Sequence, residues 1–367
     1  MAERARRSSN KALVAVLGGD GIGPEVVEAG LPVVSAAAES AGLSLDFQRA
    51  LVGGAAYDAV GHPLPKDTLA LCDRAAAIFF GAVGGPKYDK IPDPSLRPER
   101  GALLPLRKRY ELYANLRPAI VFEGLEKRSA LKPEYVKGMD VLVVRELVGG
   151  AYFGKKQLQE KKAFDVIEYD VPQIERILRF AFGAALKRKR HLTLVHKANV
   201  LLSSVLWKRV WDKMRAEYPS VRCDDCYVDA CTMYLISRPS SFDVIVTENM
   251  MGDILTDEAA QVTGSIGLLP SASLGEKRTR WGVFGLYEPA HGSAPDIAGQ
   301  GIANPLATIL SGALMLRHSF GAEKAAARIE RAVRKVLARG LRTGDLGAAK
   351  GRALGTIQMG KAVLNAL

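Results

Sequence analysis

Short apolar runs alternate with amphipathic helical patterns along almost the whole chain, and this alternation constrains the fold more than any other feature. The runs predicted as strands are Ala12–Leu17, Ala77–Val83, Val141–Val144, Leu192–Val195 and Val244–Val246. Between them, apolar residues recur at three–four spacing, as from Ile174 to Leu186 and from Glu323 to Arg339, which predicts helices with one buried face. Such alternation is typical of α/β proteins with a substantial parallel sheet. The 367 residues suffice for about two domains, and without a linker between them we expect these domains to share a sheet or interleave.

Composition excludes several classes of protein. Hydrophobic residues make up 48% and charged residues 25%, so the chain has enough apolar material for a core and is not of the disordered class. No apolar run approaches the roughly 18 residues of a membrane span. The formal net charge of +12 would attract nucleic acid, an anionic membrane or a small polyanionic substrate, and its sign alone does not choose. We interpret the basic residues 1–10 as a tail before the first strand, with a short transit peptide as the alternative.

The four cysteines are too few for a disulfide framework in a chain of this length. Cys223 and Cys226 form one CxxC pair, and a structural zinc site would need a second pair of ligands at similar spacing. We therefore expect reduced thiols in a cytoplasmic protein.

A glycine-rich segment, Gly18–Glu25, follows the first predicted strand and leads into a helix at Pro24. It does not fit the dinucleotide fingerprint G-x-G-x-x-G, because Pro24 or Val26 stands at the last position. The segment is either a structural turn or part of a nucleotide site that is not of the Rossmann type.

Two carboxylates, Asp253 and Asp257, are four residues apart, so on a helix both point from one face. Their mutual repulsion would turn into coordination around a divalent cation, and hard oxygen ligands suit Mg²⁺ or Mn²⁺. By spacing alone, two solvated carboxylates are the simpler interpretation. Asp229, which follows a short apolar strand, offers a third acid.

Three arginines, Arg107, Arg117 and Arg145, are candidates for binding carboxylates. Arg145 ends an apolar run, and Arg117 is held extended by Pro118. Guanidinium groups at strand ends suit bidentate carboxylate binding, with surface salt bridges as the alternative.

Seven segments in fixed order carry a resemblance to a known family. They are Gly19–Glu25, Arg100–Arg107, Asn115–Pro118, Lys197–Asn199, Tyr227–Asp229, Gly252–Asp257 and His291–Asp296. Together they resemble the isocitrate/isopropylmalate family of β-decarboxylating dehydrogenases, most closely its isopropylmalate branch, over about Val14 to Asp345.

The resemblance implies a two-domain α/β fold with a mixed parallel and antiparallel sheet that is not a Rossmann fold. The first domain would comprise residues 1–112 and 265–367 and carry an NAD loop. The second would comprise residues 113–264, with the dimer interface and an arm at about 149–171 that reaches across a homodimer. The implied function is NAD-dependent oxidative decarboxylation of 3-isopropylmalate to 4-methyl-2-oxopentanoate in leucine biosynthesis, in the cytoplasm, without nucleic-acid or membrane partners.

The resemblance also implies a role for each matching residue. Arg107, Arg117 and Arg145 would bind the substrate carboxylates, and Leu103 and Leu104 would meet its side group. Asp253 and Asp257, with Asp229 of the partner subunit, would hold Mg²⁺ or Mn²⁺ against the substrate, so that Asp229 belongs to the metal, substrate and catalytic sets. Lys197 of the partner subunit would move the hydroxyl proton, and Tyr152 would be the acid in the decarboxylation half. The NAD site would consist of Glu288, His291, Gly292, Ser293, Ala294, Pro295, Asp296, Ile297 and Asn304.

Some positions depart from the pattern of the family. His196 stands before Lys197 where the isopropylmalate branch usually has Asp, Gly18 replaces a usual Pro, and Met251 a usual Phe. Glu276–Trp281 is expected to be a short extra loop near the cofactor side. Homoisocitrate, isocitrate, tartrate or malate are therefore the alternative substrates.

A basic nucleic-acid-binding protein is an alternative of another class, with the run Lys187–Arg190 as its footprint. Steep salt dependence of RNA binding would favour it, and metal-dependent NADH formation would favour the enzyme.

Overall fold

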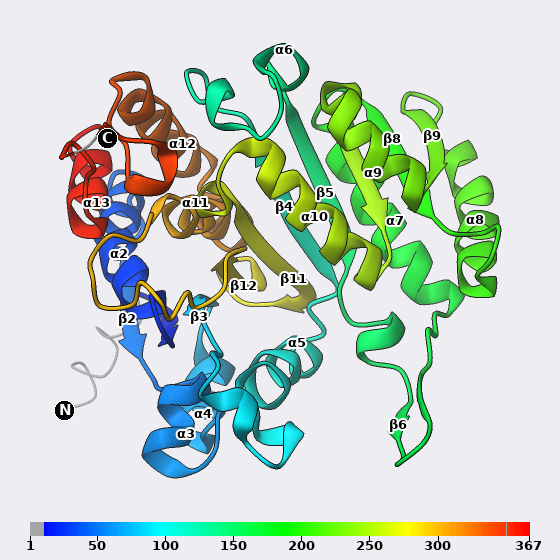
Figure 1. The fold of residues 1–367 in the computed structure, drawn as a ribbon, viewed down its shortest axis with the longest axis horizontal. Coiled ribbons are helices and arrows are strands. Elements are labelled where there is room, and N and C mark those ends of the chain that lie inside the picture. Colours follow the sequence, from blue (N-terminus) through cyan, green and yellow to red (C-terminus); the bar gives the residue numbers. More distant parts are fainter. Residues whose placement is uncertain (1–10, 350) are drawn as a thin grey trace. The chain divides into compact units, whose positions relative to one another are not determined.

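The computed structural model describes residues 11–349 and 351–367, and the predicted N-terminal tail lies outside this part of the chain. The chain divides into two compact units. The first unit comprises the chain up to Tyr110 together with Gly267–Leu367, and the second comprises Glu111–Ile266. Figure 1 shows the first unit at both ends of the colour scale and the second in the middle of it.

In the described part of the first unit, five strands follow the order β2-β1-β3-β12-β11. Their bounds are β1 Ala12–Gly19, β2 Leu45–Arg49, β3 Ala77–Ala82, β11 Pro270–Arg278 and β12 Val283–Pro289. The first four strands of this order run parallel, and β11 pairs antiparallel with β12.

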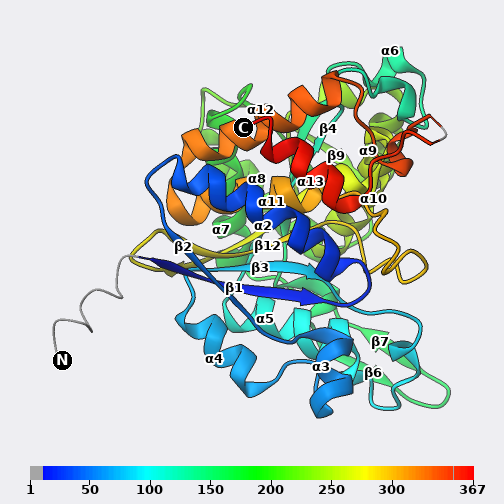
Figure 2. The same cartoon turned by 90° about the vertical axis from the view of Figure 1, so that its left-hand side faces the viewer.

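Helices lie on both faces of these strands (Figure 2). On one face are α2 (Gly23–Glu39) and α11 (Leu306–Phe320), with α12 (Glu323–Ala338) and α13 (Thr356–Leu364) packed on them. On the other are α3 (Gly53–Val60), α4 (Lys66–Arg74) and α5 (Leu104–Arg109). Pro24 lies in the first turn of α2, where its missing N–H costs nothing.

One predicted helix start differs by one residue. Asn304 was expected to cap a helix whose first residue is Pro305, but α11 begins at Leu306 with Pro305 as its N-cap residue. Asn304 Oδ1 still accepts a hydrogen bond from the Leu306 N–H at 3.0 Å. The Asn304 side chain therefore satisfies one of the free N–H groups at the start of α11, although Asn304 stands one residue before the N-cap.

The main sheet strands of the second unit follow the order β4-β5-β10-β8-β9. Their bounds are β4 Ala114–Ile120, β5 Asp140–Glu146, β8 His191–His196, β9 Arg222–Tyr227 and β10 Val244–Thr247. Only β4 is antiparallel to its neighbour β5. The helices are α6 (Pro133–Val136), α7 (Val171–Leu186), α8 (Leu202–Met214), α9 (Val228–Ser237) and α10 (Asn249–Thr263). A small hairpin, β6 (Lys156–Leu158) with β7 (Ala163–Asp165), projects from this unit.

Short turns complete the structure. A π-helical turn, η4 (Glu99–Leu103), runs directly into α5. The 3₁₀ turns are η2 Tyr88–Lys90, η3 Pro94–Leu96, η5 Glu126–Arg128, η6 Gly150–Tyr152, η7 Arg215–Glu217, η8 Pro239–Ser241, η9 Ile266–Leu268 and η10 Gly344–Leu346.

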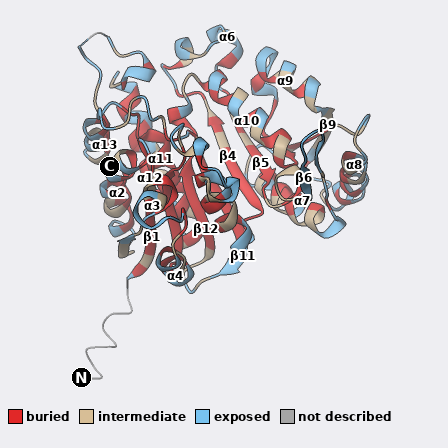
Figure 3. Cartoon of the chain, turned by 60° about the horizontal axis from the view of Figure 1, so that its bottom comes forward, coloured by how far each residue is buried: buried red, intermediate tan, exposed pale blue. Residues whose placement is uncertain are grey.

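Burial follows the strand order, as Figure 3 shows. Every residue of β3 and of β10 is buried, because both strands have a neighbour on each side and helices cover their faces. This explains why both segments appear in the sequence as continuous apolar runs rather than as alternating ones. The residues of β6 and β7 are exposed.

The predicted fold class is confirmed, since both units are α/β with mixed strand directions. Among the described residues, no helix combines the length and the apolar character that crossing a membrane requires.

Candidate functional site

The second unit brings two of the predicted arginines to the two carboxylates of α10. Arg145 Nη1 donates to Asp253 Oδ1, and Arg117 Nη1 lies 3.4 Å from the same oxygen. Arg117 Nη1 also lies 3.8 Å from Asp257 Oδ1. The arginine side chains are 1% and 9% exposed, whereas that of Asp257 is 66% exposed. The site therefore combines buried cations with acids that remain accessible.

Strand pairing explains this arrangement, with Arg145 near the end of β5 and Arg117 in the middle of β4. Arg145 and Arg117 lie on the paired strands β5 and β4, next to α10. Arg145 crosses α10 directly above Gly252, where a Cβ atom would stand 2.7 Å from Arg145 Cγ and 2.9 Å from Arg145 Cβ. Only glycine leaves room for the arginine to reach Asp253, and this gives the Gly252–Asp257 motif its physical reason.

Tyr152, in η6, joins the same cluster. Its hydroxyl donates to Asp253 Oδ2 at 2.7 Å. Burial, together with the hydrogen bond to Asp253, raises the pKa of Tyr152 to about 12. The phenol therefore keeps its proton at neutral pH, as a general acid must.

Lys197 and Asp229 form a second cluster in this unit. They follow the ends of the paired parallel strands β8 and β9, where His196 stands opposite Tyr227. Lys197 Nζ lies 2.6 Å from Asp229 Oδ1, and this hydrogen bond lowers the pKa of Asp229. Within residues 11–349 and 351–367, no three His, Cys, Asp or Glu side chains come together as a metal site. One chain therefore brings together Asp253 and Asp257 without Asp229.

The first unit carries Arg107 and the two predicted leucines. Arg107 Nη2 donates to Glu288 Oε1 at 2.9 Å, and both side chains are buried. Arg107 Nε is buried without a hydrogen-bond partner among the described residues. Leu103 and Leu104, at the junction of η4 and α5, precede Arg107 by four and three residues and so share its helix face. A buried donor beside apolar side chains suits a carboxylate that carries an apolar group.

The predicted cofactor loop lies between β12 and α11 and is anchored to the glycine-rich turn. Gly21 has φ +57° and lies against Ser293, whose carbonyl oxygen would stand 1.9 Å from a Cβ atom at position 21. Ile22 N donates to Ser293 O at 2.8 Å, and Ser293 Oγ donates to Gly84 O at 2.9 Å. The glycine-rich turn is thus a support for this loop.

Two side chains of the loop have polar atoms without a partner in the described part of the chain. His291 Nε2 is buried and makes no hydrogen bond, and burial lowers the pKa of His291, which keeps the ring neutral. The Asp296 side chain is exposed, and only its backbone oxygen accepts a hydrogen bond, from Gln300. A neutral ring donor or acceptor and an exposed carboxylate suit the adenosine part of a dinucleotide.

Sequence reasoning missed three residues of these sites. Gly21 and Gly252 leave room for Ser293 and Arg145, and Asn249 accepts hydrogen bonds from Arg145. For the two glycines, their presence in the recognised motifs was the available signal. The segment Glu276–Trp281 forms the end of β11 and the hairpin into β12. The loop predicted to bind the cofactor follows the opposite end of β12, so this segment does not adjoin that loop along the strand.

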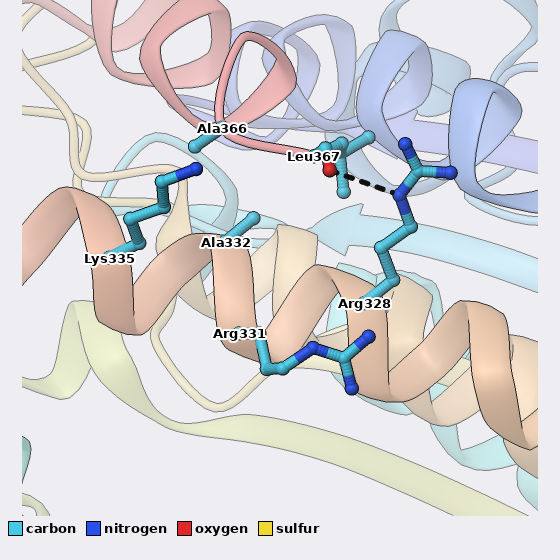
Figure 4. Close-up of a pocket in the computed structure, with 6 residues that line it drawn as sticks. All are labelled: Arg328, Arg331, Ala332, Lys335, Ala366 and Leu367. Atoms are coloured by element: carbon cyan, nitrogen blue, oxygen red, sulfur yellow. Dashed lines mark hydrogen bonds between the residues drawn. The ribbon is translucent and has the colours of Figure 1, made fainter.

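A pocket of about 320 Å³ lies elsewhere in the first unit, between α12 and the end of the chain (Figure 4). It is lined by Arg328, Arg331, Ala332, Lys335, Ala366 and Leu367, none of which belongs to the predicted site.

The α/β fold, with two buried arginines, an acidic pair and a protonated tyrosine in one cluster, defines an enzyme that acts on a small anionic molecule. The isocitrate/isopropylmalate dehydrogenase family model matches residues 13–363, and the chain belongs to this family. It is therefore a β-decarboxylating dehydrogenase, and the resemblance carried by the seven segments is confirmed.

Curated relatives include the 3-isopropylmalate dehydrogenases of Mannheimia succiniciproducens and Moorella thermoacetica, each 53% identical. The matches cover 96% and 95% of this chain and 99% and 97% of those proteins. Among solved structures, the isocitrate dehydrogenase from Methylococcus capsulatus aligns with a TM-score of 0.83 at 37% identity, covering 97% of this chain and 99% of that one.

Proposed function

We propose that this enzyme catalyses the NAD-dependent oxidative decarboxylation of 3-isopropylmalate to 4-methyl-2-oxopentanoate in leucine biosynthesis, in the cytoplasm. The observation that carries the proposal is the cluster of Arg117, Arg145, Tyr152 and Asp253, in which carboxylate-binding, acidic and proton-donating groups meet. Relatives at 53% identity bear the name of this activity, whereas the solved isocitrate dehydrogenase is 37% identical.

The side group of the substrate would meet Leu103 and Leu104. An isopropyl group gains from contact with two leucines, whereas the third carboxylate of isocitrate or homoisocitrate would be desolvated there without a partner. Tartrate and malate would leave the leucines without an apolar contact. The position of Arg107 on the same face supports the assignment, since it would bind one carboxylate while the side group lies against the leucines.

The two units would have different roles, cofactor binding in the first and metal binding in the second. The first unit would bind NAD through Glu288, the loop from His291 to Ile297, and Asn304, with Asp296 on a ribose. The unpartnered His291 Nε2 and the exposed Asp296 carboxylate support this binding. The second would hold Mg²⁺ or Mn²⁺ through Asp253 and Asp257, a hard-oxygen donor set on one helix face.

When bound, the metal would make the substrate hydroxyl more acidic and stabilise the negative charge left by CO₂, and NAD⁺ would accept the hydride. Arg107, Arg117 and Arg145 would hold the two carboxylates and so fix which face of the substrate is presented. Lys197 would take the hydroxyl proton. Tyr152, protonated at neutral pH, would deliver a proton to the carbon from which CO₂ has departed.

We further propose that two chains form a homodimer with shared sites, in which Lys197 and Asp229 serve the neighbouring chain. Asp229, Met233 and Ile236 follow one exposed stripe of α9, and the latter two are 60% and 49% exposed. Leu158 and Phe164, on the hairpin of the proposed arm, are 86% and 43% exposed. Burial of these apolar groups between two chains would favour association. Association would also supply Asp229 as the third acid that a metal site needs.

The direct test is NADH formation across a panel of 2-hydroxy acids with Mg²⁺ or Mn²⁺. We expect 3-isopropylmalate to give the highest kcat/KM and omission of the metal to abolish turnover. A higher kcat/KM with isocitrate, homoisocitrate, tartrate or malate would contradict the substrate assignment, and salt-sensitive RNA binding without NADH formation would favour the alternative class.

Shared sites have a separate test. Lys197→Met and Asp253→Asn chains, each inactive alone, would regain activity after co-refolding, because one site of the mixed dimer would carry both changes and the other neither. Mixed dimers that form but stay inactive would contradict the sharing.

A further inference from the structure

The side chain of Asn249, the first residue of α10, is fully buried and uses all its hydrogen-bonding groups. Its Oδ1 accepts from Arg145 Nε at 3.0 Å and from Arg145 Nη2 at 2.7 Å. Its Nδ2 donates to the carbonyl oxygens of Leu147 at 3.1 Å and Gly149 at 3.0 Å. Because one end faces only donors and the other only acceptors, the network leaves one orientation of the amide.

The side chain that accepts hydrogen bonds from Nε and Nη2 of Arg145 is neutral, and this affects the net charge around a buried cation. Arg145 is 1% exposed, and a cation in such a position needs firm hydrogen bonds. A second carboxylate would supply them, but together with Asp253 at Nη1 it would place two negative charges against one guanidinium. The amide of Asn249 supplies two acceptor contacts without adding negative charge, so the guanidinium is oriented while its attraction for an anion is preserved.

The same amide fixes the segment that leads to Tyr152. Leu147 and Gly149 belong to the turn after β5, and Tyr152 ends the 3₁₀ turn that follows. Asn249 therefore links the orientation of Arg145 to the backbone that carries the tyrosine, and both of these side chains contact Asp253.

We propose that Asn249 is a positioning residue, which holds Arg145 and the turn before Tyr152 in place while leaving the charge of Arg145 available to a substrate carboxylate. This inference rests on the proposed function, in which Arg145 binds that carboxylate. It predicts that a negative charge at position 249 is worse for substrate binding than the loss of hydrogen bonds alone.

The test compares Asn249→Asp with the neutral variants Asn249→Ser and Asn249→Leu. The Asp variant is isosteric and keeps both acceptor contacts with Arg145, but its second oxygen replaces the Nδ2 donor and faces the carbonyl oxygens of Leu147 and Gly149. The Ser variant keeps a shorter acceptor, and the Leu variant keeps none. We expect the Asp variant to raise the KM for the hydroxy acid at least tenfold, and more than the Ser variant does. The KM for NAD should change less than twofold.

With a merely structural role, the substrate KM of the three variants would follow their loss of unfolding free energy, which urea unfolding measures, and the Asp variant would stand out in KM no more than it does in stability. A substrate KM of the Asp variant within twofold of wild type would overturn the proposal. If the Asp variant does not fold, the neutral pair decides, since equal substrate KM values for Ser and Leu would exclude the positioning of Arg145.

Failure of the proposed function would look different. The wild type would then form no NADH from 3-isopropylmalate, or Arg145→Lys would leave the substrate KM unchanged. The Asn249 variants are therefore compared with whichever hydroxy acid the wild type oxidises best.

Discussion

Replacement of Gly21 by alanine should damage NAD binding through a backbone contact, although Gly21 was not predicted to touch the cofactor. An added Cβ would stand 1.9 Å from the carbonyl oxygen of Ser293, so Ser293 would have to retreat by about 1.5 Å to reach ordinary contact. That movement would break the 2.8 Å hydrogen bond from Ile22 N to Ser293 O, which is worth about 1 kcal/mol.

Gly61→Ala is the matched control. Gly61 also has a left-handed backbone, with φ +74° against +57° at Gly21, but no atom lies within 4 Å of its Cβ position. Both variants should lose roughly 1–2 kcal/mol of unfolding free energy because of the left-handed backbone. Gly21→Ala should lose about 1 kcal/mol more from the broken hydrogen bond. Urea unfolding of the two variants measures this difference.

Activity separates the two variants further. A displacement of about 1 Å at a positioned group can cost up to about a hundredfold in rate, so we expect kcat/KM for NAD⁺ to fall at least tenfold in Gly21→Ala. In Gly61→Ala it should stay within twofold of wild type. If the two variants show the same kcat/KM for NAD⁺, then the glycine-rich turn does not position the loop.

Three further predictions concern the metal, the cofactor and pH. Asp253→Asn should lower turnover by at least about a hundredfold even at saturating Mn²⁺, because it replaces a charged ligand by a neutral one, and wild-type activity of this variant would refute the metal assignment. Asp296→Lys should narrow the preference for NAD⁺ over NADP⁺, since the carboxylate that binds a ribose hydroxyl also repels a 2′-phosphate, and an unchanged ratio of the two kcat/KM values would refute it. Burial raises the pKa of Glu146 from 4.5 to about 7, so its protonated form stabilises the fold below pH 4.5, and on the order of 3 kcal/mol is lost as pH rises through about 7. Urea unfolding between pH 5 and 8 should show this fall in the wild type and a smaller one in Glu146→Gln, and equal slopes would contradict it.

The sequence determined the elements and the identity of most candidate residues. The alternation of apolar runs with helical periodicity is local information, because strands and helices impose their own periods on neighbouring residues. The i, i+4 spacing of Asp253 and Asp257 placed both carboxylates on one helix face for the same reason. The recognised segments then supplied the family, which neither spacing nor composition could have given.

Only the tertiary structure decided which distant residues meet. Arg145 and Asn249 are 104 residues apart and come together because β5 and β10 are neighbours in the sheet. Gly21 reaches Ser293 because β1 and β12 both flank β3, and no local pattern encodes that strand order. The exposed pair of Lys197 and Asp229 likewise follows from the pairing of β8 with β9. Local sequence sets dihedral preferences and faces, whereas contacts between segments depend on the packing of the whole sheet, where many weak interactions act together.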